Sequence, residues 1–196
     1  MGERLGAMPD YISVDIRRFT RLLHPKMVSL VVALREDGKP NAMPASWVMP
    51  ASVEPPLLVV AVSPRRYTYD LIQRRPEFTV NPVPLKMRGV VEYLGSVSGR
   101  DVDKLAHAKL GLLQPVAVST PCLEEALACI ECSVWAQYPC GDHYLIVGKV
   151  RAARVRRDAW TGSLYDLSAA EPLLHLGGDE YATASREPRG KERGEG

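Results

Sequence analysis

The stretch "NAMPASWVMPASVEPPLLVVAVSPRRYTYDLI", residues 41–72, decides the fold. At its centre, Leu57 to Val62 form an uninterrupted apolar run, which predicts a strand that is covered on both faces and central to the fold. An Arg-Arg-Tyr-Thr turn follows, and Tyr69 to Arg75 then predict a short helix with Thr68 as its N-cap, ending before Pro76. A core strand and a helix start therefore stand next to each other in the sequence, after a segment of small residues and prolines.

Upstream of this stretch, Met27 to Leu34 are rich in β-branched residues and predict a strand that ends at an Asp-Gly turn. We expect the chain to return antiparallel through Asn41 to Val48, which completes a hairpin. Pro44 lacks an N–H, so the returning strand should be irregular or lie at an unpaired edge. Before Pro25, a helix is predicted by apolar spacing, although Ser13 to Ile16 fit a short strand equally well. The spaced residues are Ile12, Ile16, Phe19 and Leu23.

Downstream, Glu77 to Asn81 predict another strand, and residues 98–111 predict a second helix. Ser98 or Asp101 would cap the start of this helix, and Gly111 would follow its end.

Two long strand candidates, residues 127–138 and 143–155, are joined by Pro-Cys-Gly-Asp and should form a hairpin. A last segment, residues 173–181, turns at a Gly-Gly pair. Several strands with two short inserted helices predict a mainly β fold, an antiparallel barrel.

The composition is that of a globular protein, because 46% of the 196 residues are apolar and 24% are charged. We expect an N-terminal extension over residues 1–24, one barrel domain over residues 25–182 and a disordered, charged tail over residues 183–196. The net charge of +2 is too small to argue for nucleic acid. No apolar run approaches the roughly 20 residues of a membrane helix, and the first residues do not resemble a secretion signal. We therefore expect a cytoplasmic protein with neither nucleic acid nor a membrane as its partner.

The cysteines lie in one segment, at Cys122, Cys129, Cys132 and Cys140. Cys129 and Cys132 have the CxxC spacing of metal and redox sites. In a strand, however, residues three apart point to opposite faces, and no second CxxC or paired histidine completes a zinc site. We expect buried thiols rather than a metal, with a disulfide as an open alternative.

Motifs of hydrolases and nucleotide-binding folds are missing from the sequence. It contains no GxSxG, no HExxH, no GxxxxGK[ST] and no GxGxxG after a strand, and its histidines are scattered. No catalytic side chain and no metal ligand is predicted. Any chemistry is expected to come from a bound cofactor.

The chain resembles the flavin reductase-like proteins of the FMN-binding split-barrel group, which include flavoredoxins. The resemblance is carried, in this order, by "NAMPASW", "PPLLVVAV", "RYTYDLI", "EFTVN", "SGRDVDK" and "GDHYLIVGKV", and it covers about residues 25–180. It implies a Greek-key split β-barrel with short inserted helices, a homodimer with FMN near the subunit interface, and hydride or electron transfer by that flavin.

The residues of these motifs also make physical sense as a flavin site. Small residues such as Ala45 and Ser46 would let backbone N–H groups approach the polar edge of a flavin ring. The "SPRRYT" turn offers hydroxyl and guanidinium donors to a phosphate, just ahead of a helix start whose free N–H groups favour an anion. The residues predicted to contact the cofactor are Met43, Pro44, Ala45, Ser46, Trp47, Ser63, Arg65, Arg66, Tyr67, Thr68, Asn81, Ser98 and Lys104.

Plainer roles stay open for several of these residues. Thr68 would then only cap its helix, Trp47 would only fill the core, and Asn81 would only close a turn. Ser98 and Lys104 fit the solvated start of a helix about as well as a ligand contact. Which of the two arginines faces the phosphate is also open.

The activity that the resemblance implies is that of an FMN-dependent NAD(P)H oxidoreductase of the flavin reductase type. It would pass electrons from NAD(P)H through the flavin to a small-molecule or protein acceptor, and no protein acid or base is required. Two alternatives stay open. One is a flavoredoxin-type electron carrier that does not oxidise NAD(P)H itself, and the other is a barrel that binds another ligand such as haem.

Overall fold

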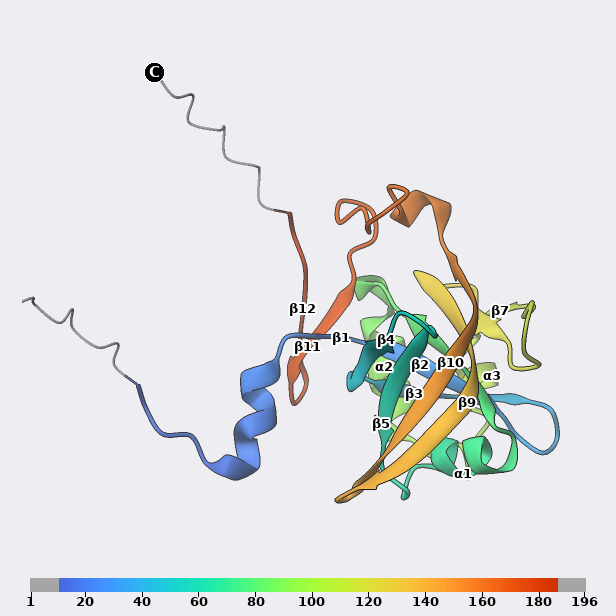
Figure 1. Cartoon of the computed structure of the whole chain (residues 1–196). Helices are drawn as coiled ribbons and strands as arrows, with labels where there is room; N and C mark the ends of the chain where they lie inside the picture. Colours follow the sequence, from blue (N-terminus) through green and yellow to red (C-terminus); the bar gives the residue numbers. More distant parts are fainter. Residues whose placement is uncertain (1–10, 187–196) are drawn as a thin grey trace, which may run out of the picture.

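An antiparallel sheet of seven strands, in the order β3-β2-β6-β9-β10-β5-β4, dominates the computed structural model (Figure 1). The structure describes residues 11–186. The strands of this sheet are β2 (Ser29–Leu34), β3 (Pro40–Ala45), β4 (Val48–Ser52), β5 (Leu57–Val62), β6 (Glu77–Pro82), β9 (Ala128–Cys140) and β10 (His143–Val155). The fold is therefore mainly β, as the sequence predicts.

The two edge strands of the sheet, β3 and β4, are neighbours in the sequence and are joined only by Ser46 and Trp47. Three peptide steps span at most about 11 Å between Cα atoms, so the sheet must curl until its edges meet. Within the described residues β3 and β4 do not pair with each other, and the curled sheet stays open between them. This gap is the split of the predicted barrel.

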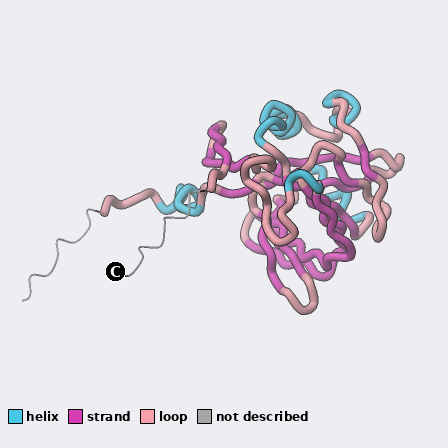
Figure 2. Tube along the Cα trace, turned by 90° about the horizontal axis from the view of Figure 1, so that it is seen from above, coloured by secondary structure: helices cyan, strands magenta, loops and turns pink. Residues whose placement is uncertain are grey.

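Strand β2 is buried along its whole length because it lies between two cores. Val31 and Ala33 point into a core that β2 shares with helix α1 (Tyr67–Arg74). Leu30 and Val32 point to the other face, into a core that contains residues of α2 (Arg88–Ser96) and α3 (Lys104–Ala108). Seen from above, the helices lie at the periphery of the strands (Figure 2).

Two small sheets and three short 3₁₀ helices complete the described chain. One sheet contains β1 (Lys26–Met27), β11 (Leu173–Gly177) and β12 (Glu180–Thr183), and the other pairs β7 (Leu112–Leu113) with β8 (Cys122–Leu123). The 3₁₀ helices are η1 (Ile16–Leu23), η2 (Leu85–Met87) and η3 (Arg157–Ala159). Thr183, which was assigned to the predicted tail, ends β12, whereas residues 187–196 of that tail lie outside the described residues. No helix among residues 11–186 is long and apolar enough to cross a membrane.

Three predicted turns are confirmed. The β2–β3 hairpin turns at Gly38 and the β9–β10 hairpin at Gly141, both with the positive φ that glycine adopts without strain. The β11–β12 hairpin turns at Gly177 and Gly178, as the Gly-Gly pair indicates. Pro44 lies on the edge strand β3, where its missing N–H costs no pairing.

Two strand predictions need correction. Residues 41–48 are not one returning strand, because the chain breaks at Ser46 and crosses from one edge of the sheet to the other. Strand β5 is not covered on both faces: Leu58, Val60 and Val62 are buried, whereas the alternate residues of the strand are only half-buried.

The helix predicted over residues 98–111 is much shorter, because only Lys104 to Ala108 are helical. Its N-cap is Asp103 rather than Ser98 or Asp101, and the Asp103 carboxylate accepts a hydrogen bond from the Ala106 N–H (3.2 Å). The left-handed residue that follows the helix is Lys109, with φ of 52°, rather than Gly111. Helix α2 was not predicted.

One cysteine is a buried free thiol, as expected, and two others form a disulfide, the open alternative. Cys122 and Cys129 are disulfide-bonded, with Cα atoms 5.7 Å apart. Cys132 is a buried free thiol in the core beside β2, and burial raises its pKa to about 12. Cys129 and Cys132 thus point to different surroundings, as expected for a strand. Glu131 lies near the disulfide, but it accepts a hydrogen bond from Arg154 (3.2 Å).

Candidate functional site

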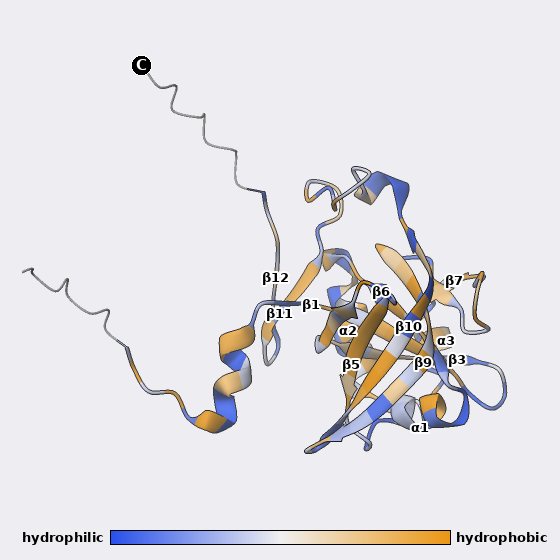
Figure 3. Cartoon of the chain, in the orientation of Figure 1, coloured by the Kyte–Doolittle hydropathy of each residue, from blue (hydrophilic) through white to orange (hydrophobic). Residues whose placement is uncertain are grey.

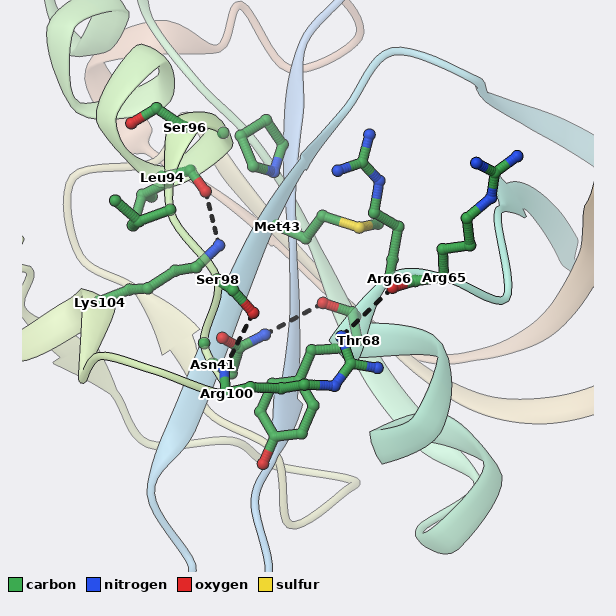
Figure 4. Close-up of a pocket in the computed structure, with 15 residues that line it drawn as sticks. Asn41, Met43, Arg65, Arg66, Thr68, Leu94, Ser96, Ser98, Arg100 and Lys104 are labelled. Carbon is green, nitrogen blue, oxygen red and sulfur yellow. Dashed lines mark hydrogen bonds between the residues drawn. The ribbon is translucent and has the colours of Figure 1, made fainter.

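A pocket of about 380 Å³ lies where strand β3, the start of α1, the end of α2 and the start of α3 meet (Figure 4). We call it the α1–α2 pocket. It is lined by Asn41, Met43 and Pro44 of β3, by residues 65–68 at the start of α1, by residues 94–100 at the end of α2 and after it, and by Lys104 of α3.

The start of α1 presents unbonded backbone donors to this pocket. The N-cap of α1 is Arg66, whose side chain makes no capping hydrogen bond. Thr68, predicted as the N-cap, instead lies buried in the first turn, and its hydroxyl accepts a hydrogen bond from Asn41 Nδ2 (3.0 Å). The first N–H groups of α1 therefore lack a side-chain cap among the described residues, and the helix dipole adds partial positive charge there. This end of the pocket favours an anion.

Four cationic side chains border the pocket, and two of them, Arg100 and Lys104, donate hydrogen bonds to other groups of the protein. Arg100 donates to Asp70 Oδ2 (2.5 Å) and to the carbonyl oxygen of Arg65 (3.2 Å), and its guanidinium lies 5.2 Å from the Tyr67 ring centre. These contacts tie the segment between α2 and α3 to the first turns of α1.

Lys104, which lines the pocket, links α3 to α2. Its side chain is buried, and Nζ donates to the carbonyl oxygen of Leu94 (2.6 Å) in the last turns of α2. Burial lowers the pKa of Lys104, and the positive charge of Arg66 lowers it further. The two cations are therefore close enough to repel each other.

Arg65 and Arg66 are exposed cations of the pocket that, unlike Arg100, form no ion pair among the described residues. Among residues 11–186, neither has a carboxylate within ion-pair distance. Their charges add to that of the helix start and of Lys104. Asp70 is already paired with Arg100, and Asp142, whose pKa Arg65 helps to lower, is bonded to His143. The arrangement is suited to a group with more than one negative charge.

Asn41 supplies an acceptor beside this positive end. Its side chain is 3% exposed, and Oδ1 has no hydrogen-bond partner although Nδ2 is bonded to Thr68. A buried oxygen left without a donor costs about 1 to 3 kcal/mol, so a ligand hydroxyl would stabilise it. A Cβ atom at Gly99 would overlap Asn41 Oδ1, which means that glycine keeps this part of the pocket free.

The pocket brings eight of the thirteen predicted residues together: Met43, Pro44, Arg65, Arg66, Tyr67, Thr68, Ser98 and Lys104. Two others lie apart from it. Asn81 is fully buried, and its amide donates to the Leu30 carbonyl (3.1 Å) and accepts from the Leu123 N–H (3.1 Å), so it braces the core. The carbonyl oxygen of Ser63 accepts the Arg66 N–H (3.0 Å) and shapes the turn before α1.

The remaining three, Ala45, Ser46 and Trp47, lie next to the pocket at the link between β3 and β4. The Trp47 ring lies 5.0 Å from that of His143, and Lys26 Nζ lies 5.6 Å from the Trp47 ring centre. His143 in turn lowers the pKa of Asp142, whose carboxylate lies 2.7 Å from its ring nitrogen. We call this link and its aromatic pair the ring shelf, because it offers a flat surface near the pocket.

Sequence reasoning missed Asn41, Arg100 as a bracing residue, and the whole contribution of α2. Asn41 and Arg100 both lie within motifs that carried the resemblance, so their positions were visible but their partners were not. For α2, the available signals were the helical apolar spacing of Met87, Val90, Val91 and Leu94 and the i,i+4 pair of Arg88 and Glu92, whose side chains lie 2.7 Å apart.

The family model described as "Flavin reductase like domain" matches residues 20–183 of this chain. The chain belongs to this flavin reductase-like family. An uncharacterized protein of Pyrococcus abyssi is 36% identical over 83% of the chain and 92% of its own length. A relative from Aeropyrum pernix is 31% identical over 84% of the chain, and the match spans 62% of that relative.

Solved structures agree with the family. Flavoredoxin from Methanosarcina acetivorans superposes with a TM-score of 0.82 and 27% identity, covering 94% of this chain and 97% of that one. An FMN-binding protein from Thermus thermophilus, solved with p-hydroxybenzaldehyde, gives a TM-score of 0.77 and 28% identity over 93% and 99% of the two chains. The family and these neighbours support a flavin-binding protein of the oxidoreductase class.

Proposed function

We propose that this chain binds FMN with its phosphate in the α1–α2 pocket and transfers electrons from NAD(P)H through that flavin to an acceptor. The observation that carries the proposal is the pair of arginines, Arg65 and Arg66, which form no ion pair within residues 11–186 and lie beside the uncapped start of α1. A phosphate would neutralise both charges and accept the free N–H groups. The family, and the FMN named for the Thermus thermophilus neighbour, favour FMN as the molecule that carries this phosphate.

The residues present fit the three parts of FMN. The phosphate fits the arginines and the start of α1, and a chain of hydroxyl groups offers the donor that Asn41 Oδ1 lacks. The flat ring fits the ring shelf, where Ala45 and Ser46 are small enough for a ring to approach the backbone. Pro44 lines both the α1–α2 pocket and the hollow beside Ala45 and Ser46, so the two hollows meet at this residue.

When bound, FMN would supply the electron chemistry, taking a hydride from NAD(P)H and passing electrons to a small molecule or a protein. The chain itself binds, orients and polarises. Positive charge from Arg66 and Lys104 favours negative charge on the bound group, and backbone N–H groups at the ring shelf are preorganised donors. No side chain of the site is required as an acid or a base.

We also propose that the protein is a homodimer that acts in the cytoplasm. Closed twofold assemblies are the commonest oligomers, and the curled sheet leaves apolar surface open at its split. NAD(P)H as the donor favours a cytoplasmic site of action. The Cys122–Cys129 disulfide is compatible with a reducing compartment because both residues are buried from attacking thiols.

Flavin titration tests the binding proposal. Protein freed of flavin is titrated with FMN and with riboflavin, and binding is followed by quenching of flavin fluorescence. We expect FMN to bind about tenfold to a hundredfold more tightly, because riboflavin lacks the phosphate that the arginines would hold. Equal affinities, or no binding of FMN, would contradict the proposed pocket.

Anaerobic mixing with NADH and with NADPH tests the oxidoreductase part. Loss of the oxidised-flavin absorbance with either donor supports the proposal. A flavin that stays oxidised with both donors, but is bleached by dithionite, would leave binding intact and replace the reductase by an electron carrier.

A further inference from the structure

The N-terminal arm, which we define as residues 11–24, extends away from the barrel in both views (Figures 1 and 2). Its helix η1 contains no buried residue. The arm exposes its large apolar side chains, each at least 44% accessible: Tyr11, Ile12, Val14, Ile16, Phe19, Leu22 and Leu23. Colouring by hydropathy shows orange segments alternating with blue along η1 (Figure 3).

These apolar side chains form an organised surface. A 3₁₀ helix has three residues per turn, so Ile16, Phe19 and Leu22 lie in one line along η1. Together the exposed residues of the arm present on the order of 1,000 Å² of mainly apolar surface, well above the 300 to 600 Å² of the largest patch on a typical monomer. Such a surface indicates a binding partner.

Contacts at the root of the arm direct it away from its own barrel. The ring of His24 lies 5.1 Å from that of His175 on β11, and His24 Nδ1 bonds to the Thr20 carbonyl (2.8 Å) within the arm. The guanidinium of Arg21 lies against Gly177, where any side chain would collide with it. The last turn of η1 is thereby fixed on the β11–β12 hairpin, and residues 11–19 continue beyond it.

The barrel has an apolar groove that residues 11–186 leave uncovered. Two hollows of about 380 Å³ each share Met27, Val48 and Met49, and they lie on opposite faces of the sheet edge, one lined by Leu58 and the other by Val59 and Ala61. Of the described residues that line them, Lys26 alone carries a charge. Val59 and Ala61, the half-buried side of β5, form part of the wall. The uninterrupted apolar run of β5 is typical of a strand covered on both faces, but the described residues bury only one face of it.

We propose that the arm of one copy lies in the apolar groove of a second copy, and that the second arm lies in the first groove. The groove begins at Met27, directly after the arm, so a twofold axis near β1 would let both arms cross to the partner. The surface of one arm matches the roughly 800 Å² per partner of a standard interface. Arg17, Arg18 and Arg21 lie off the apolar line of η1 and would stay at the solvated rim.

This exchange goes beyond the proposed function, but it bears on it. Ser46 and Trp47 of the ring shelf also line the groove. If the flavin ring lies on that shelf, the partner's arm would cover it and exclude water, a consequence that rests on the proposed function.

Light scattering on flavin-free full-length protein tests the exchange independently of any cofactor. We expect a dimer, and we expect its dissociation constant to rise at least a hundredfold in the triple variant Ile16→Ser, Phe19→Ser, Leu22→Ser. The matched control is Val116→Ser with Leu164→Ser, because these residues are similarly exposed but lie outside both the arm and the groove. The control should remain dimeric. A monomeric wild type, or an unchanged dissociation constant in a triple variant whose circular dichroism is native, would overturn the proposal.

Cross-linking identifies what the arm binds. In a Cys140→Ser background, chains with Phe19→Cys and chains with Met49→Cys are purified separately, mixed, allowed to exchange and oxidised. We expect a disulfide-linked dimer that contains one chain of each kind. If a variant that carries both Phe19→Cys and Met49→Cys cross-links only within one chain, the arm covers its own barrel and the proposal fails. It fails equally if no dimer is trapped and the wild type sediments with anionic lipid vesicles, as a basic amphipathic helix on a membrane would.

Discussion

Arg154 and Arg66 carry the same charge, yet Arg154 is paired within the protein, whereas Arg66 lines a pocket and has no ion-pair partner in the part of the chain that the structure describes. Arg154 donates to Glu131 Oε1 (3.2 Å) and to the Gln114 carbonyl (2.8 Å). Glu131, fully buried, also accepts the backbone N–H groups of three successive residues after Pro115, at 2.7 to 3.3 Å. We call this cluster the Glu131 clamp.

The two regions differ in where their charged side chains find partners. In the Glu131 clamp the carboxylate is paired with Arg154 and with backbone N–H groups of the chain, so the cluster fastens a loop to the sheet, although Arg154 Nε has no partner among the described residues. In the α1–α2 pocket Arg66 repels Lys104, whose pKa is lowered first by burial and further by the charge of Arg66. Charges that are paired within the protein contribute to its stability, whereas charges without a partner in the protein indicate a ligand.

The largest expected effect is the loss of stability on disrupting the Glu131 clamp. Glu131→Ala leaves Arg154 and several buried N–H groups without an acceptor, and we expect it to lower the free energy of unfolding by about 3 to 5 kcal/mol. Urea unfolding followed by circular dichroism measures this loss. Glu36→Ala is the control, because Glu36 pairs with Arg74 at an exposed position and should cost at most about 1 kcal/mol. The ratio of FMN to riboflavin affinity should not change in either variant, and a change in Glu131→Ala would blur the distinction between the two regions.

The second prediction concerns Arg66, where FMN affinity rather than protein stability should change. Arg66→Ala removes a charge-assisted contact to the phosphate, so FMN affinity should fall about tenfold to a hundredfold, or roughly 1.5 to 3 kcal/mol. Riboflavin affinity should stay the same, and the flavin-free protein should be no less stable than the wild type, since a repulsion has been relieved. Arg65→Ala is measured alongside, because it reports which arginine dominates. Equal losses for both flavins, or a loss of stability like that of Glu131→Ala, would show that Arg66 is structural.

A smaller effect is expected at Gly99. The methyl group of Gly99→Ala would overlap Asn41 Oδ1, and we expect FMN and riboflavin to weaken alike, by about fivefold or roughly 1 kcal/mol. Gly89→Ala is the matched control in α2, because a Cβ there meets nothing within 4 Å. It should leave both affinities unchanged. If Gly99→Ala weakens FMN alone, Asn41 contacts the phosphate rather than a part that both flavins share.

The smallest effect is a pH dependence from Lys104. Burial and Arg66 lower its folded-state pKa below the usual lysine value of about 10.4. Between these two values the unfolded chain binds the proton more strongly, so this residue makes the free energy of unfolding rise with pH in that window. Urea unfolding between pH 8 and 10.5 should show a steeper rise for the wild type than for Lys104→Met. Parallel curves would mean that the lysine charge is not strained by its surroundings.

Much of the fold could be predicted from local sequence. The Asp-Gly and Gly-Gly turns identified hairpins because only glycine adopts positive φ without strain, and β-branched runs identified the strands beside them. Helix α2 was missed since Gly89 and Gly95 lower its intrinsic propensity, and burial of Val91 and Leu94 in the core stabilises it instead.

The cationic end of the site was predictable, but its organisation was not. Arg65 and Arg66 lie visibly before a helix start. That neither is neutralised, while Arg100 is, depends on the contact of Arg100 with Asp70, thirty residues away in the sequence. The unsatisfied Asn41 oxygen is likewise a tertiary property, set by Thr68 on another element. The choice of Asp103 over Ser98 as a helix cap follows from the same contacts between distant segments.

The two-residue link between β3 and β4 joins the cofactor pocket to the apolar groove through a single short tether. Met43 and Pro44 line the pocket immediately before this link, and Val48 and Met49 line the groove immediately after it. Any displacement of one edge of the split is therefore passed to the other. Thermodynamic linkage then requires reciprocity: whatever factor FMN contributes to subunit association, association returns to FMN affinity. In the proposed dimer, removal of the flavin would therefore weaken subunit association by the same factor.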